Sequence, residues 1–108
     1  HYKNIYHVNV FISNKKYSFD GYLDTGNQLK SPISHKSVIL VDFDIENSNY
    51  YYVPYKGLNS SGVIPCIKPD RIIIDDKEIS NCLVGFSKDK ININGCCCIL
   101  PNSLKEEL

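Results

Sequence analysis

Short stretches in which apolar and polar residues alternate recur along this chain, a pattern typical of half-buried β-strands. Residues 2–12 (YKNIYHVNVFI) alternate in this way, and residues 13–15 (SNK) predict a hairpin turn into KKYSFDGYL. Residues 37–43 (SVILVDF) are a continuous apolar run and predict a buried strand. In the loop before that run, Pro32 argues against a regular strand.

A long hairpin is predicted over residues 50–67 (YYYVPYKGLNSSGVIPCI). Its two arms are rich in β-formers, and residues 57–62 (GLNSSG) form the tip between them. Glycine at both ends of a Ser/Asn tip gives the backbone freedom to turn. We therefore expect a loop here that can change its conformation.

The last third of the chain predicts one more hairpin, one strand and a helix. The hairpin has arms at 71–75 (RIIID) and 78–86 (EISNCLVGF), joined by a turn at 76–77. Residues 96–100 (CCCIL) predict a buried strand, and 101–108 (PNSLKEEL) predict a short helix that starts with proline.

The pattern as a whole predicts one all-β domain over residues 1–108 that ends in a short helix. Period and position alone give the core prediction, which is Phe19, Leu23, Val38, Leu40, Ile72, Ile74, Leu83 and Ile99. His1 opens in the middle of a pattern, so we expect the chain to be part of a longer protein.

Charge and hydropathy argue against two classes of protein, those that bind nucleic acid and those that span a membrane with a helix. Lys and Arg number 12, as do Asp and Glu, so no basic surface argues for nucleic acid. No apolar run approaches the ~20 residues of a membrane-spanning helix, and no signal peptide is visible.

Five cysteines are an odd number, and none lies in a CxxC pair. Adjacent residues on a strand point to opposite faces, so Cys96–Cys98 do not suggest a disulfide framework, and a reducing compartment is favoured. The expected role is that of small buried apolar residues. A zinc site built from Cys66, Cys82 and the triplet is the alternative, although its spacing matches no zinc finger. No metal or organic cofactor is predicted.

Residues 22–29 (YLDTGNQL) place an acid at the buried end of a predicted strand. A carboxylate there costs free energy unless it is hydrogen-bonded, paired or protonated. Asp-Thr-Gly after an apolar strand is the signature of aspartic peptidases, in which Thr25 would brace the turn and Gly26 would allow close approach of the backbone. The competing interpretation is an ordinary Asp-initiated turn with a left-handed glycine.

Peptide hydrolysis by this route needs two carboxyl groups that share one proton. One takes a proton from the attacking water while the other polarises the scissile carbonyl. Asp-Thr-Gly occurs once in this chain, so a second copy of the chain would have to supply the partner carboxyl at a two-fold axis. We therefore predict a homodimer in which each chain contributes Asp24.

The order of elements around this motif resembles that of a retroviral-type peptidase monomer. A strand leads to Asp-Thr-Gly, and a glycine-flanked hairpin, an apolar-apolar-Gly segment (residues 83–85), an apolar strand and a helix follow. The sequence from Phe19 to Leu104 is also similar to the C-terminal domain of the sporulation sigma-E factor-processing peptidases. Its most specific pieces are LDTGNQL and a segment that joins Gly62 and Ile64 to Lys-Pro-Asp at 68–70.

That resemblance implies a retropepsin-like fold, a closed β-barrel monomer with a short C-terminal helix. It implies an aspartic endopeptidase, active as a homodimer, that removes the N-terminal pro-segment of a sporulation sigma-factor precursor. The parent protein would be anchored in a bacterial mother-cell membrane with this domain on the cytoplasmic side, and a signalling protein is a further possible partner.

Carried over residue by residue, the resemblance makes Asp24 the catalytic carboxylate and gives Thr25, Gly26 and Asn27 the supporting turn. The substrate-binding flap would be the hairpin 50–67, with its tip at Gly57, Leu58, Asn59, Ser60, Ser61 and Gly62. Two departures from retroviral peptidases stand out, Asn27 after the motif and Pro101 where a glycine precedes their terminal helix.

Two other functions fit the same residues. A non-catalytic β-domain could keep this shape and bind a peptide or partner, or a genuine peptidase could be activated only through its membrane region or a signalling partner. A phosphatase of the haloacid-dehalogenase type, suggested by DFD at 42–44 and DD at 75–76, needs a parallel α/β core that this sequence does not predict. We interpret those acids as strand-end and turn residues.

Overall fold

The computed structural model describes residues 3–26, 35–45, 49–56 and 61–108. Almost every described element is a β-strand, so the predicted all-β class is confirmed. The elements are β1 (Ile5–Ile12), β2 (Lys15–Asp24), β3 (Ser37–Val41), β4 (Tyr51–Lys56), β5 (Ser61–Ile67), β6 (Arg71–Ile74), β7 (Lys77–Ile79), β8 (Cys82–Phe86), β9 (Cys98–Pro101) and the 3-10 helix η1 (Asn102–Glu107).

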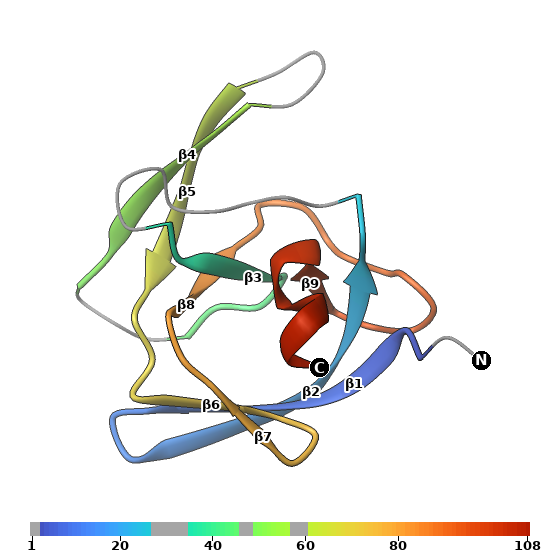
Figure 1. The fold of residues 1–108 in the computed structure, drawn as a ribbon. Helices are drawn as coiled ribbons and strands as arrows, with labels where there is room; N and C mark the ends of the chain where they lie inside the picture. The colour runs from blue at the N-terminus through green and yellow to red at the C-terminus, as the bar shows by residue number, and fades with distance from the viewer. Residues whose placement is uncertain (1–2, 27–34, 46–48, 57–60) are drawn as a thin grey trace.

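All nine described strands join one sheet in the order β4-β5-β8-β3-β9-β2-β1-β6-β7 (Figure 1). The β2–β9 and β3–β8 pairs are parallel, and the remaining pairs are antiparallel. Strands β4 and β7 are the two edges of this sheet, so the described strands do not close into the barrel that the family resemblance implied. Figure 1 shows why, because the β4–β5 hairpin extends away from the rest of the molecule and from the short β7.

The β1–β2 hairpin turns where the sequence predicted. Ser13 and Asn14 both have positive φ, 50° and 67°, as the two central residues of a type I′ turn require. That turn matches the right-handed twist of the flanking strands and sets the register that pairs Ile12 with Lys15.

Two clusters of buried side chains lie on opposite faces of the sheet. The larger cluster joins β1, β2, β6 and β7 to inward-facing residues of β3, β8 and β9 and to the 3-10 helix, and it includes Val8, Val10, Leu23, Ile39, Ile72, Ile74, Val84, Leu100 and Leu104. The smaller cluster lies where β4 and β5 meet β3 and β8, and it consists of Val38, Val53, Cys66 and Leu83 with the half-buried Ile64.

Five of the eight predicted core residues are buried, namely Leu23, Val38, Ile72, Ile74 and Leu83. Phe19, Leu40 and Ile99 are only half-buried. Phe19 packs against the rim of the larger cluster and against the Phe43 ring. Leu40 and Ile99 pair with each other on the face opposite the larger cluster, where they are only partly covered, so their prediction as core residues was wrong.

The predicted arm at 78–86 is wrong as a single strand. It divides into β7 and β8 at Ser80 and Asn81, and Asn81 has a φ of 56° that turns the chain. The Asn81 carbonyl accepts a hydrogen bond from the Ser37 N–H at 3.1 Å. That bond lies where β8 joins β3, so β8 leaves the β6–β7 hairpin and runs between β5 and β3.

All five cysteines are free, and Cys97 alone among them is not buried. Burial raises the pKa of the Cys82 thiol to about 12 and that of the Cys66 thiol to about 12 as well. These thiols are protonated and inert near neutral pH, as expected for apolar filling residues. In the part of the chain that the structure describes, no group of three or more His, Cys, Asp or Glu side chains could hold a metal.

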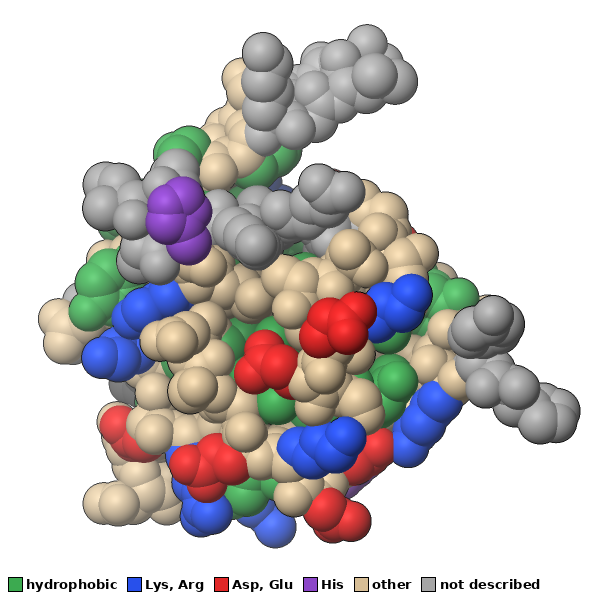
Figure 2. Space-filling view, viewed as in Figure 1, with side chains coloured by type: hydrophobic (Ala, Val, Ile, Leu, Met, Phe, Trp, Pro, Cys, Tyr) green, Lys and Arg blue, Asp and Glu red, His purple; other side chains and the backbone are tan. Residues whose placement is uncertain are grey.

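The surface mixes both signs of charge. Figure 2 shows acidic and basic side chains interspersed over the lower part of the molecule, around β6 and β7. Within the described ranges no helix is long and apolar enough to cross a membrane.

Candidate active site

Asp24 is the last residue of β2, next to β9 in the middle of the sheet. Its Cα pairs with that of Pro101, and the preceding pair is Leu23 with Leu100, both in the larger cluster. An added Cβ at Gly21 would come within 3.0 Å of the Leu100 side chain, so β2 and β9 approach closely here. The strand that ends in Asp24 is therefore packed closely against β9 and the larger cluster. The Asp24 side chain itself is only half-buried.

The Asp24 side chain accepts a hydrogen bond that stabilises the turn after it. The Gly26 N–H donates a hydrogen bond of 3.0 Å to the Asp24 Oδ1, the geometry of an Asx turn. The Asp-initiated turn of the competing interpretation is therefore present, but its left-handed glycine is not, because Gly26 does not have a positive φ. The hydrogen bond satisfies one carboxylate oxygen and lowers the cost of partial burial.

The other predicted turn residues differ in what they do. Thr25 and Gly26 are exposed, and the Thr25 hydroxyl makes no hydrogen bond to any residue that the structure describes. An added Cβ at Gly26 would lie 3.4 Å from the Asp24 Oδ1, an ordinary contact distance. Asn27 lies outside the described residues.

A row of half-buried apolar side chains leads away from the acid along its own face of the sheet. Tyr22 lies two residues before Asp24, so it points to the same face. It pairs with Ile99 of β9, and Ile99 pairs with Leu40 of β3. All three are half-buried and lie outside the larger cluster. The row forms an apolar surface beside the carboxylate.

The row continues to the base of the β4–β5 hairpin. Leu40 pairs with Gly85 of β8, and Gly85 pairs with Cys66 of β5. A Cβ at Gly85 would come within 2.9 Å of a Val38 methyl and 3.1 Å of an Ile64 methyl, so glycine is required for this close packing. The acid and the hairpin are thus joined by one continuous face of the sheet.

The predicted hairpin over 50–67 is confirmed. Its arms β4 and β5 pair over six positions, from Tyr51 with Cys66 to Lys56 with Ser61. Of the predicted tip, Gly57, Leu58, Asn59 and Ser60 lie outside the described residues, whereas Ser61 and Gly62 are exposed residues of β5.

Aromatic side chains dominate the hairpin. Tyr51 and Tyr52 are 55% and 65% exposed, and the Tyr55 ring lies 3.1 Å from where a Gly62 Cβ would be. Val53 packs into the smaller cluster and is 2% exposed. The arm is therefore attached at its base by Val53 and presents aromatic surface beyond it.

Sequence reasoning did not identify the row of Tyr22, Leu40 and Ile99. The alternation of side chains along a strand could have placed Tyr22 on the face of Asp24, since the two lie two residues apart on one strand. Leu40 and Ile99 required the pairing of β3 with β9, which strand patterns do not give. Asp42, predicted as a strand-end acid, also links two segments, because its Oδ2 accepts the Ile91 N–H at 2.7 Å and so joins the loop between β8 and β9 to the end of β3.

Comparison with known proteins gives two matches. The family described as "Sporulation factor SpoIIGA" matches residues 1–51 of this chain. The chain is also 29% identical over 98 residues to the "Probable sporulation sigma-E factor-processing peptidase" of Clostridium acetobutylicum. These matches confirm the resemblance inferred from the sequence. The second match covers 82% of this chain but only 37% of the relative, so the chain spans well under half the length of that protein.

The matched residues 1–51 contain Asp24 and its turn.

Proposed function

We propose that this chain is an aspartic endopeptidase domain of the retroviral type, active as a homodimer in which each chain contributes Asp24. The observation that carries the proposal is the position of this acid. Asp24 is half-buried at the end of a central strand and is anchored by the Gly26 N–H. One apolar face of the sheet connects it to a projecting hairpin.

One chain offers only half of the chemistry. Among the described residues, the Asp24 carboxylate makes its hydrogen bond to Gly26 and forms no ion pair. Two carboxyl groups about 3 Å apart share a single proton, because they cannot both be ionised. In a symmetric dimer, one Asp24 takes a proton from water and the other donates a hydrogen bond to the scissile carbonyl.

The substrate lies between the Asp24 face of the sheet and the β4–β5 hairpin. An extended peptide there gains backbone hydrogen bonds, and its alternate side chains enter pockets. The row of Tyr22, Leu40 and Ile99 favours an apolar side chain next to the scissile bond. Closure of the hairpin, including the predicted tip 57–62, excludes bulk water from the reaction.

The relative's name supplies the substrate class. We propose that the substrate is the precursor of a sporulation sigma factor, from which an N-terminal pro-segment is removed. The family resemblance also supports a membrane-anchored parent protein in the mother cell, with this domain on the cytoplasmic side and a signalling protein as a further partner.

The test is cleavage of the sigma-factor precursor by Asp24→Asn and Asp24→Ala variants. In a homodimer the substitution removes both members of the catalytic pair, and the rate is expected to fall by about three orders of magnitude or more. Asp24→Asn keeps a side-chain oxygen for the Gly26 N–H, so its fold should remain unchanged. Pro-segment release followed by mass spectrometry measures the effect.

Asp20→Asn is the matched control, an exposed acid on the same strand and outside the site. It should cleave at the wild-type rate. Cleavage by folded Asp24→Asn at the wild-type rate would refute the aspartic mechanism. The absence of cleavage by the wild-type dimer, together with binding of the precursor, would instead support the non-catalytic binding domain.

A further inference from the structure

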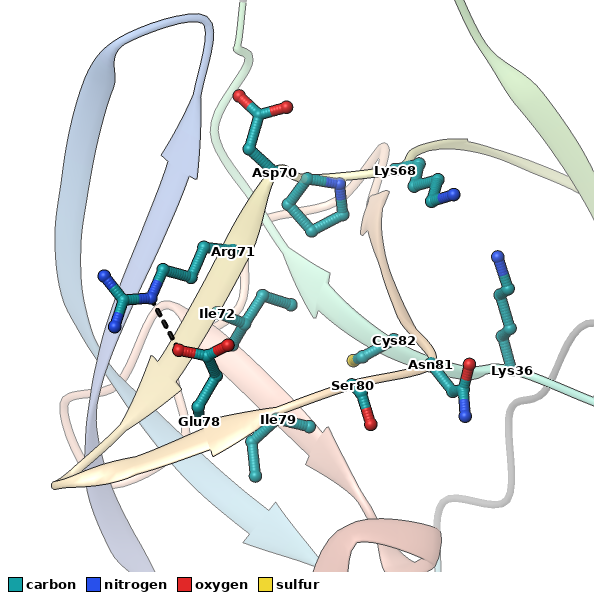
Figure 3. Close-up of a pocket in the computed structure, with 11 residues that line it drawn as sticks. Lys36, Lys68, Asp70, Arg71, Ile72, Glu78, Ile79, Ser80, Asn81 and Cys82 are labelled. Carbon is teal, nitrogen blue, oxygen red and sulfur yellow. Dashed lines mark hydrogen bonds and ion pairs between the residues drawn. The ribbon is translucent and has the colours of Figure 1, made fainter.

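A pocket of about 240 Å³ lies away from Asp24, where the β6–β7 hairpin meets the beginnings of β3 and β8 (Figure 3). Lys68, Pro69 and Asp70, the Lys-Pro-Asp segment that the sequence comparison singled out, form one of its walls. Residues 24–26 do not contribute to its lining. The proposed peptidase chemistry therefore gives this segment no role.

Two lysines lie at this pocket without an anionic partner. Lys36 is half-buried and Lys68 is exposed, and in Figure 3 their side chains extend toward the same side of the pocket. Neither ammonium forms an ion pair with any residue in the described part of the chain. Two like charges that face one space repel each other, and an anion between them would relieve that repulsion.

The two acidic residues of the pocket accept hydrogen bonds from residues other than the two lysines. The Glu78 Oε1 accepts a hydrogen bond of 2.6 Å from the Arg71 Nε. The Asp70 Oδ2 accepts the N–H of Ser13 at 2.9 Å, and its carboxylate points away from Lys68 in Figure 3. Glu78 is paired with Arg71, and Asp70 adds one negative charge that points away from Lys68. The lining residues, three basic and two acidic, therefore carry a net charge of +1, and the two lysines have no ion-pair partner among the described residues.

The remaining lining residues and the volume of the pocket limit the size of a ligand. Ile72, Ile79 and Cys82 line the pocket but are almost fully buried, so they offer little surface to a ligand, while Ser80 and Asn81 add polar groups at the rim. The volume is below the range of about 300–1,000 Å³ of drug-sized ligand sites. It therefore suits one side chain rather than a cofactor.

We propose that this pocket binds an acidic side chain of a peptide, with its carboxylate between Lys36 and Lys68. The pocket is a docking site for an acidic segment of a protein partner, separate from the Asp24 face. This inference goes beyond the proposed function, and its test measures binding without turnover, so each can fail independently of the other.

The test is a titration of the isotope-labelled 108-residue chain, followed by amide shifts in NMR spectra. The probes are the capped pentapeptide Ala-Leu-Glu-Leu-Ala, its Gln counterpart, and inorganic phosphate. The Glu peptide should shift the amides of Ser80, Asn81 and Lys68, and the Gln peptide should bind at least about tenfold more weakly. Added salt should weaken binding of the Glu peptide.

Variants assign the effect to the lysines. Lys36→Gln/Lys68→Gln should lose the Glu-dependent shifts, whereas Lys15→Gln/Lys16→Gln, exposed at the β1–β2 turn, should keep them. Lys36→Glu/Lys68→Glu should prefer a Lys peptide to the Glu peptide, a reversal that a merely structural role of the lysines would not produce.

Three results would overturn the proposal. The first is equal binding of the Glu and Gln peptides, and the second is an equal loss in both pairs of lysine variants. The third is saturable binding of phosphate without binding of the Glu peptide, which would make this a phosphate site.

Discussion

The two ends of the sheet are built from similar alternating strands, yet they bury very different amounts of apolar surface. At one end, β1, β2, β6 and β7 share the larger cluster, in which Val8, Val10 and Ile74 are fully buried. At the other end, β4 and β5 rest on a cluster of four buried residues and expose tyrosines. The first end buries most of the apolar core, and the second leaves aromatic surface exposed.

The same substitution at the two ends should sharpen this contrast most. Ile74→Ala removes a fully buried side chain from the larger cluster and should cost about 2–5 kcal/mol of unfolding free energy. Ile64→Ala removes the same atoms from a half-buried position in the smaller cluster and should cost about 1 kcal/mol or less. Urea unfolding measures both, and equal costs would show that the two ends do not differ.

Gly85 tests how tightly the hairpin end is attached. Gly85→Ala places a methyl group within 2.9 Å of Val38 and should cost about 1–3 kcal/mol through overpacking. Gly62→Ala meets the Tyr55 ring, which is partly exposed and can move, so we expect a change within about 0.5 kcal/mol. A Gly85→Ala protein as stable as wild type would mean that β5 does not pack closely on β8.

The turn of the β6–β7 hairpin gives the smallest expected effect. A hydrogen bond from the Lys3 ammonium, aided by one from the His7 N–H, holds the pKa of the Asp75 carboxyl below its usual value of 3.8. Because the folded pKa is lowered, the stabilisation is present above pH 3.8 and is lost as the pH falls through the folded pKa.

Asp75→Asn removes this carboxylate, and Asn tolerates the left-handed backbone at position 75, where φ is 54°. The variant should be slightly less stable than wild type at neutral pH and equally stable well below pH 3.8. Urea midpoints at the two pH values measure this difference, and a gap that widens in acid would contradict the stated linkage.

Strand periodicity was sufficient to predict the local elements of this fold. Both ends of the β1–β2 hairpin, the apolar strand at 37–41 and the two arms of 51–67 follow from alternation and turn residues. Strand periodicity did not predict which strands far apart in the sequence pair with each other. Parallel pairing of β3 with β8 depends on Asn81 turning the chain, and nothing local distinguishes that turn from a continuous arm.

The candidate site follows the same division. The Asp24 turn could be predicted because Asp, Thr and Gly are adjacent, and its Asx hydrogen bond is local. The row beside it joins residues of three strands, and the lysine pocket joins Lys36 to Lys68 across the fold. Residues of these two groups come together only when distant strands pair. The sequence therefore predicted some of them as core residues and some as loop residues, and gave no prediction for the rest.

The most direct test of the shared Asp24 centre is a mixing experiment. Wild-type and Asp24→Asn chains are co-refolded in equal amounts, and precursor cleavage is compared with that of wild type at the same total concentration. If each active centre needs an Asp24 from both chains, only pure wild-type dimers are active and the rate falls to about one quarter. A rate of one half would show that each chain acts alone, and would contradict the account.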